Sequence, residues 1–285
     1  MADLTTIAKQ LFQAIEQGSL DTVTGLVDAS PGLVYVRQEN EGLGLSTSLQ
    51  YAAAKGRLDI CKYLVERGAE VYTNPMNTYP PVLEAAWNNH QDVVDYFLNE
   101  IPDKAHGTNK LGVTINLAGR KGWTDLVRRH IERDPLSVHY RGWIGDSPLH
   151  WPAHNNSVDI VEMLLDAGAA VDADEVGWIG GKPLQWASEH APKSVEVLLR
   201  RGADVNSRNI KADSPLYGVT PLIMNATQKD DCSEVTELLI AAGADIQSVD
   251  ANGKNALDHA VERGLVRIID VLTRNGATQS RTHHS

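Results

Sequence analysis

The sequence of 285 residues contains only two cysteines, Cys61 and Cys232, which lie far apart in the chain. Such a low count excludes a disulfide scaffold and favours a reducing, cytoplasmic location. No apolar run approaches the roughly 20 residues that a membrane helix needs. The N-terminus lacks the basic start and the apolar stretch of a signal peptide. We therefore expect a cytoplasmic protein without a membrane partner.

Basic charge is also scarce, because 26 Lys and Arg stand against 37 Asp and Glu, which gives a net charge of −11. A general nucleic-acid binder needs a basic face to displace counterions from phosphates, so we expect no nucleic-acid partner. Hydrophobic residues make up 42% and charged residues 22% of the chain, which is a globular composition. The length agrees with one or two domains.

Motifs of nucleotide binding and nucleophilic catalysis are missing as well. The glycines at 142–145 and 177–181 fall in turns rather than between a strand and a helix, and no Gly-x-Ser-x-Gly occurs. Cys61 replaces an apolar residue of an expected helix, and Cys232 lies in a short insertion, so neither resembles a nucleophile. The sequence predicts no cofactor.

What the chain does contain is a repeat, whose period is visible in the turns between pairs of expected helices. These turns recur every 33 to 38 residues, at Gly18, Gly56, Asn89, Gly122, Asn156, Ala191, Lys229 and Gly264. The spacing suits one helix-turn-helix plus a connecting turn. It predicts eight repeats that stack and share one continuous core.

Recurring residues give the repeat a family resemblance. Ser147-Pro-Leu-His150 and Thr220-Pro-Leu222 are each followed by Leu-Leu and Gly-Ala. This pattern resembles the ankyrin repeat from about Leu4 to Ala277, and it is degenerate in the first, third and fourth repeats. The resemblance implies an all-α ankyrin-repeat solenoid of helix-turn-helix units with β-turn fingers, in one domain over residues 1–285. The expected repeats are 4–34, 43–74, 76–108, 109–141, 142–176, 177–214, 215–249 and 250–277, with a tail at 278–285.

The fifth repeat shows the physical reason for the pattern. Ser147 is expected to cap the first helix, with Pro148 at its first position. Leu149 and Ala153 form a short apolar face, and the second helix carries apolar residues at 160, 161, 164 and 165. Pro152 breaks the rule for a helix interior, where it is expected to kink the helix at a cost of about 3 kcal/mol.

In the ankyrin family, ligands meet the β-turn fingers and the exposed ends of the first helices, which line a concave groove. Carried onto this sequence, that geometry predicts one binding surface. Its expected residues are Tyr79, Trp87, Asn88, Trp143, Ile144, Asp146, His154, Asn155, Trp178, Ile179, Glu189, His190 and Tyr217.

Two adjacent repeats carry nearly the same ten residues, at 142–151 and 177–186. Packing explains their shared glycines and Pro-Leu, but it does not explain Trp143 and Trp178, which the family geometry places in solvent. Exposed aromatics of this kind are typical of a contact surface. The alternatives are that the two rings stack on each other, or that a duplicated repeat kept them by chance. Trp151 and Trp186 occupy a helix position that is usually packed, so we expect both in the core.

Polar residues beside these aromatics leave a second reading open. A carboxylate and an imidazole within reach can act as acid and base, and tryptophan faces suit sugars. The catalytic candidates are Asp146, His154, Glu189 and His190. The alternative is that these residues are simply solvated and have no role in binding or catalysis, as is usual for charged residues of solenoid loops. His150 and His154 have the spacing of a metal pair but lack the HExxH frame, so we expect no metal site.

Taken together, these patterns favour a binding scaffold that holds a protein partner in the groove. The alternative is a binder of a small molecule, such as a sugar or a secondary metabolite, or an unusual enzyme that uses the same polar residues. The fold does not decide between them, because function resides in the site and not in the scaffold.

Overall fold

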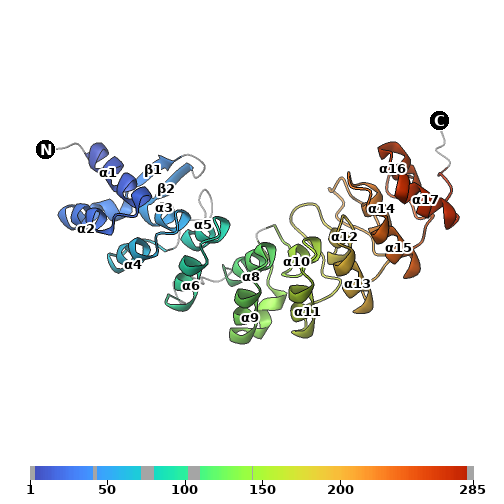
Figure 1. The fold of residues 1–285 in the computed structure, drawn as a ribbon, viewed down its shortest axis with the longest axis horizontal. Helices are drawn as coiled ribbons and strands as arrows, with labels where there is room; N and C mark the ends of the chain where they lie inside the picture. The colour runs from blue at the N-terminus through green and yellow to red at the C-terminus, as the bar shows by residue number, and fades with distance from the viewer. Residues whose placement is uncertain (1–3, 41–43, 72–79, 102–109, 143, 281–285) are drawn as a thin grey trace. The chain divides into compact units, whose positions relative to one another are not determined.

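The computed structural model describes residues 4–40, 44–71, 80–101, 110–142 and 144–280 (Figure 1). The chain forms two compact units, residues 1–110 and 111–285, and each is described by itself. Apart from one pair of short strands, the regular elements of the described residues are helices. The all-α fold is therefore confirmed.

The described residues of the first compact unit form three helix pairs and a hairpin. The strands β1 and β2 pair antiparallel, with Arg37 opposite Thr47. Thr47 then caps α3, because its Oγ1 accepts from the Gln50 N–H at 3.2 Å while Gln50 Oε1 accepts from the Thr47 N–H at 2.7 Å. The elements are α1 (Leu4–Gln17), α2 (Leu20–Ala29), the 3₁₀ helix η1 (Pro31–Tyr35), β1 (Arg37–Asn40), β2 (Gly44–Thr47), α3 (Ser48–Ala54), α4 (Leu58–Glu66), α5 (Pro81–Trp87) and α6 (Gln91–Asn99).

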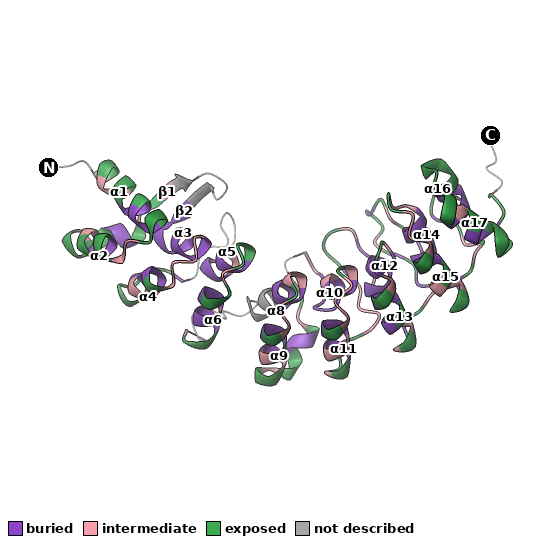
Figure 2. Ribbon diagram, in the orientation of Figure 1, coloured by how far each residue is buried: buried purple, intermediate pink, exposed green. Residues whose placement is uncertain are grey.

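The second compact unit stacks its helices in two rows, one row made of α10, α12, α14 and α16 and the other of α9, α11, α13, α15 and α17. Residues that face neighbouring helices are buried, as Figure 2 shows. The elements are α8 (Lys110–Lys121), α9 (Thr124–Arg133), η2 (Pro135–His139), α10 (His150–His154), α11 (Val158–Asp166), α12 (Pro183–Ala187), α13 (Pro192–Arg200), α14 (Pro221–Ala226), α15 (Ser233–Ala241), α16 (Ala256–Arg263) and α17 (Val266–Arg274).

The predicted turns between paired helices are largely confirmed. Six of the eight positions have a left-handed backbone, namely Gly18, Gly56, Asn89, Gly122, Asn156 and Gly264. Asn156 has φ at 58°, and asparagine enters this region more readily than most residues other than glycine. Its Oδ1 accepts from the Ser194 N–H at 2.9 Å, which ties the turn to the next repeat. The number of repeats stays a prediction.

A row of three side-chain hydrogen bonds joins successive repeats of the second compact unit. The donors occupy one position of successive first helices, and the acceptors are the carbonyls that precede the next repeat's Ser147, Lys182 or Thr220. The bonds join Asn116 to Asp146 (3.0 Å), His150 to Gly181 (3.4 Å) and Gln185 to Val219 (2.6 Å). Each of these donor residues is buried. The row therefore fixes the register of one repeat on its neighbour without any water contact.

The fifth repeat differs from expectation at its start. Helix α10 begins at His150, so Ser147 does not cap it; instead its N–H and hydroxyl lie 3.0 and 2.8 Å from His150 Nδ1. Pro152 is the third residue of α10, where a missing N–H lacks an intrahelical acceptor, so the expected kink penalty does not arise. Its ring lies against Gly119, where an added Cβ would come within 2.8 Å of it. The apolar core positions of this repeat are buried as predicted.

Candidate functional site

The expected binding residues fall into three groups. Tyr79 and Trp143 lie outside the described residues. Trp87 and Asn88 belong to the first compact unit, where both are exposed. The rest belong to the second compact unit, which alone brings several of them together: Ile144, Asp146, His154, Asn155, Trp178, Ile179, Glu189, His190 and Tyr217.

Three tryptophans of the second unit form an aromatic row. The ring of Trp186 lies edge-on to those of Trp151 and Trp178, at centroid distances of 5.2 and 6.4 Å. Trp178 is 56% exposed, as the finger geometry predicted, and Trp186 is buried as expected. The expectation for Trp151 is wrong, because its ring is only half-buried. The Arg120 guanidinium, 4.1 Å from that ring's centroid, takes the place of a covering side chain.

A buried carboxylate holds the finger that carries Trp178, which we define as residues 175–182. Glu175 is 2% exposed and accepts from three backbone N–H groups, those of Gly177, Trp178 and Gly180. The Trp186 indole N–H donates to the Gly180 carbonyl at 3.2 Å, which closes the finger onto the helix behind it. Sequence reasoning missed Glu175, although an acidic residue just before a glycine-rich turn is typical of such an acceptor.

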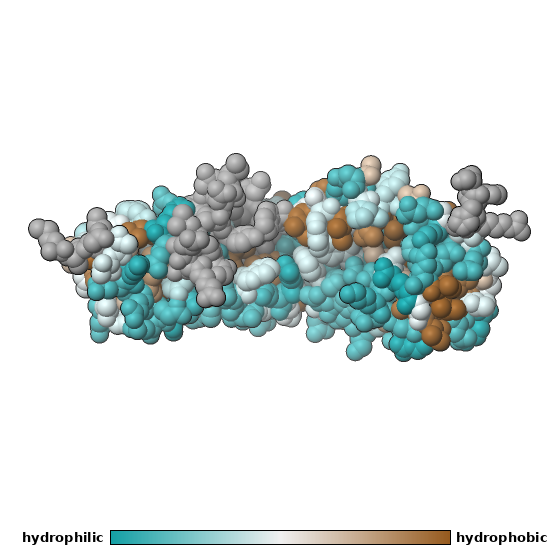
Figure 3. Space-filling view, turned by 90° about the horizontal axis from the view of Figure 1, so that it is seen from above, coloured by the Kyte–Doolittle hydropathy of each residue, from teal (hydrophilic) through white to brown (hydrophobic). Residues whose placement is uncertain are grey.

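The next finger supports the same loop from the other side. The Ile179 carbonyl accepts from Asn209 Nδ2 at 2.9 Å and from the Ser214 hydroxyl at 2.5 Å. Ile144 and Ile179 are half-buried, whereas Tyr217 is 47% exposed. Figure 3 shows hydrophobic side chains among hydrophilic ones on the face of this unit seen from above. The second unit therefore presents apolar side chains on loops that are held by several hydrogen bonds.

Asp146 does not belong to the exposed polar set in which the sequence placed it. It is 2% exposed, and its Oδ2 accepts from Asn116 Nδ2 at 2.8 Å. Burial raises the pKa of Asp146, and the Asn116 bond opposes that rise. A carboxylate enclosed in this way joins one repeat to the next and has no access to a ligand. We therefore remove it from the catalytic candidates.

The remaining polar candidates do meet. His154 Nε2 lies 3.4 Å from Glu189 Oε2, with the two side chains 24% and 21% exposed. The ring of His190 stands edge-on to that of His154 at 4.5 Å between centroids. Asn155 connects the group to α8, because its Nδ2 donates to the Arg120 carbonyl at 2.8 Å. The hydrogen bond to Glu189 raises the pKa of His154, against the effect of burial. Such a pair can hold or pass a proton.

His150, by contrast, is a structural residue. It is fully buried between Ser147 and the Gly181 carbonyl, and burial lowers its pKa to about 4. An imidazole held neutral in this way cannot reach the surface where His154 lies. The pairing of His150 with His154 that the spacing suggested is therefore absent.

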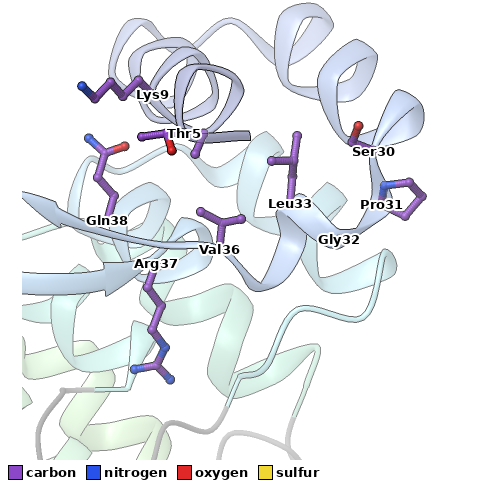
Figure 4. Close-up of a pocket in the computed structure, with 10 residues that line it drawn as sticks. Thr5, Lys9, Ser30, Pro31, Gly32, Leu33, Val36, Arg37 and Gln38 are labelled. Atoms are coloured by element: carbon purple, nitrogen blue, oxygen red, sulfur yellow. The ribbon is translucent and has the colours of Figure 1, made fainter. Parts of the chain in front are cut away.

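The first compact unit holds a separate cavity of about 730 Å³ beside α1, η1 and β1 (Figure 4). Leu33 and Val36 point into it, while the Arg37 guanidinium points away. The cavity contains none of the predicted site residues. Elsewhere in this unit, Glu84 is 6% exposed, and burial raises its pKa to about 7. Sequence reasoning missed this carboxyl as well.

Among the described residues, no helix is both long and apolar enough to cross a membrane. Burial raises the pKa of the Cys61 thiol, which leaves it a poor nucleophile.

Comparisons with known proteins identify the repeat. A family model of ankyrin repeats, in three copies, matches residues 11–109 and 115–209. Ankyrin repeat protein nuc-2 of Neurospora crassa is 26% identical over 282 residues, which is 94% of this chain and 24% of that protein. Ankyrin repeat and KH domain-containing protein mask-1 of Caenorhabditis elegans is 27% identical over 307 residues, or 94% of this chain and 11% of that protein.

E3 ubiquitin-protein ligase KEG of Arabidopsis thaliana is 33% identical over 139 residues, which is 48% of this chain and 8% of that protein. The chain thus spans a quarter or less of each of these three relatives. The shared part is the repeat region, and the family model covers well over half of the present chain. The chain belongs to the ankyrin-repeat family.

Proposed function

We propose that this chain is a binding scaffold that holds a protein partner on the finger side of its second compact unit, with Trp178 as the central anchor. Ankyrin repeats generally mediate interactions between proteins. The finer assignment to this surface is ours. The proposed surface includes His154, Asn155 and His190 beside the aromatic row. We propose that binding takes place in the cytoplasm.

One observation carries the proposal: Trp178 is exposed and yet held in a rigid loop. An apolar ring that is 56% exposed contributes little to folding. The buried Glu175 carboxylate nevertheless fixes the backbone beneath that ring through three hydrogen bonds. A preordered aromatic loses little conformational entropy on binding, which is the property of an interface anchor.

The other expected contacts extend the surface. Ile179 lies on the same finger as Trp178. Tyr217 lies on the following finger, and Ile144 lies on the preceding one. Trp143 and Tyr79 are further finger residues of the sequence. Trp87 and Asn88 are proposed as contacts of the first compact unit with the same partner.

A peptide selection tests the proposal. Random peptides displayed on phage are selected on the immobilised full chain, and the dissociation constant of a selected peptide is measured by fluorescence polarisation. Trp178→Ala is expected to weaken binding by about thirtyfold or more, because anchors contribute about 2 kcal/mol or more. Tyr35→Ala is the matched control, since Tyr35 is an aromatic that is 59% exposed on the first compact unit. Equal affinity of Trp178→Ala and the parent chain for every selected peptide would contradict the proposal.

The enzyme alternative rests on the His154–Glu189 pair beside aromatic rings. Metabolites that raise the melting temperature of the full chain are incubated with it and their consumption is followed. If the pair is an acid–base couple, Glu189→Gln reduces turnover by about 10²–10⁴ while affinity is retained. A ligand that stabilises the protein and is recovered unchanged would exclude catalysis on that ligand and show binding alone.

A further inference from the structure

The surface beside the aromatic row contains three nitrogen and oxygen donors that lie close enough together to hold a metal ion. We call His154, Glu189 and His190 the His–Glu–His cluster. His154 ends α10, and the other two residues follow α12 in the turn before α13. One ligand atom from each residue lies within 4.8 Å of the other two. Two adjacent repeats therefore contribute to a single donor set.

Hydrogen bonding around the cluster orients His154. The Asn155 Nδ2 donates to the Arg120 carbonyl at 2.8 Å, which turns the amide so that its Oδ1 faces His154 Nδ1 at 3.1 Å. Because Oδ1 is an acceptor, the ring hydrogen is assigned to Nδ1. The lone pair of Nε2 then points at Glu189 Oε2, 3.4 Å away. Two acceptors face each other there, so a cation, either a proton or a metal ion, belongs between them.

His190 supplies the third donor, which a metal ion requires and a proton does not. A proton needs only the His154–Glu189 pair, whereas Zn²⁺ requires three or four donors. With bonds of about 2.0–2.1 Å, tetrahedral Zn²⁺ separates its ligand atoms by about 3.4 Å. The measured separation of His154 Nε2 and Glu189 Oε2 already equals that value. His190 is exposed, so its ring is free to turn and close the remaining gap.

We propose that the His–Glu–His cluster binds a divalent transition metal ion of the Zn²⁺ class, with a fourth position open to water. Asn155 is the positioning residue, since it bonds the non-coordinating nitrogen of His154 in the manner of an outer-shell partner. Two imidazoles and one carboxylate are the donor set of borderline ions such as Zn²⁺ and Co²⁺, in contrast to the oxygen-rich sites of Ca²⁺ and Mg²⁺. The proposal does not depend on the scaffold function.

A second histidine–carboxylate pair provides the matched control. His259 Nε2 lies 2.9 Å from Asp250 Oδ2, with side chains 16% and 4% exposed. That carboxylate also accepts from the N–H groups of Asn252 and Lys254. No third metal donor joins this pair in the described part of the chain. We therefore expect this pair not to bind a metal ion.

The test uses the full chain stripped of metal and titrated with ZnCl₂ by isothermal calorimetry, with a Co²⁺ absorption spectrum as a second readout. His283 and His284 of the tail are replaced by Ala in every sample, because adjacent histidines also bind Zn²⁺. We expect one Zn²⁺ per chain and the visible bands of four-coordinate Co²⁺. His190→Gln and Glu189→Gln are each expected to weaken Zn²⁺ binding by about tenfold or more, and Asn155→Ala by less.

The variant His259→Gln is expected to leave Zn²⁺ affinity unchanged. The cluster variants replace surface residues, and circular dichroism verifies that they are folded. Equal affinity of the parent chain, His190→Gln and Glu189→Gln would overturn the proposal, as would the loss of all binding when the tail histidines alone are replaced. Since no peptide is present in these titrations, a failure here is independent of the peptide selection on Trp178.

Discussion

Two neighbouring fingers of the second compact unit share the residues Gly-Trp-Ile-Gly and Pro-Leu, yet the structure uses them differently. In the later finger, Glu175 accepts three backbone N–H groups and the following Trp186 is 2% exposed. In the earlier one, Asp146 bonds a side chain of the preceding repeat, and Trp151 is half-buried. The comparison teaches that a repeat position has no fixed environment, because the preceding repeat decides what covers it.

Equivalent tryptophans should therefore differ in their contribution to stability, and this is the largest effect we expect. Trp186→Ala removes a ring enclosed by Trp151, Trp178 and His150, and we expect a loss of about 3–5 kcal/mol. Trp151→Ala should cost about 1–3 kcal/mol, because part of its ring already contacts water. Urea unfolding followed by circular dichroism measures both variants. Equal losses would mean that the two positions are equally buried.

The next largest effect is expected at Glu175, the buried acidic residue of the later finger. Glu175→Gln replaces an acceptor oxygen with an amide N–H₂ that faces backbone N–H groups, so we expect about 2–3 kcal/mol of destabilisation. Val176→Ala, at a neighbouring residue that is 61% exposed, should change stability by less than about 0.5 kcal/mol. Thermal unfolding compares them. A Glu175→Gln protein as stable as the parent would show that the carboxylate does not hold the finger.

Glu84 stands in α5 at the position that Trp186 occupies in α12, each five residues before its turn. Because its folded pKa is raised from 4.5 to about 7, the folded state binds more protons than the unfolded state between these values. Stability should then fall as pH rises through this window. Glu84→Gln removes the penalty, and we expect the variant to gain about 3 kcal/mol over the parent at pH 8 relative to pH 4. A pH-independent difference would contradict the burial of this carboxyl.

His150 and Gln185 occupy the same position of the inter-repeat bond row, so His150→Gln should have the smallest effect, within about 1 kcal/mol near neutral pH. Burial lowers the pKa of His150 to about 4, so the unfolded state binds more protons below the usual value of 6.5. The parent chain should therefore lose stability as pH falls from 6.5 towards 4. The variant should lose less, as urea unfolding at pH 4.5 and pH 7 will show. An identical pH dependence would place the imidazole in solvent.

Sequence alone predicted the fold because the period of a repeat can be counted directly in the sequence. The turn residues Gly122 and Asn156 mark the helix pairs, and apolar spacing marks the buried faces. The exposure of Trp178 followed from its place in a finger. The exposure of Trp151 could not be predicted in the same way, because its ring is contacted by Arg120, which belongs to another repeat.

The polar half of the candidate site was less predictable. Asp146 and Glu189 are both acidic residues near turns, but only the local backbone path of each determines that Asp146 is buried and Glu189 is not. The meeting of His154 with His190 depends on the register between repeats. That register is set by the bond between His150 and the Gly181 carbonyl, which no local pattern reveals.

Hydrogen exchange tests the central claim, that the Trp178 finger is the binding surface, without any substitution. Amide exchange of the full chain is measured by mass spectrometry with and without a selected peptide at saturation. We predict protection at residues 175–182 and at the neighbouring turns 188–191 and 154–157, with no change at 31–38, a segment of the first compact unit that contributes to its cavity. Protection confined to 31–38, with exchange at 175–182 unaltered, would contradict the account.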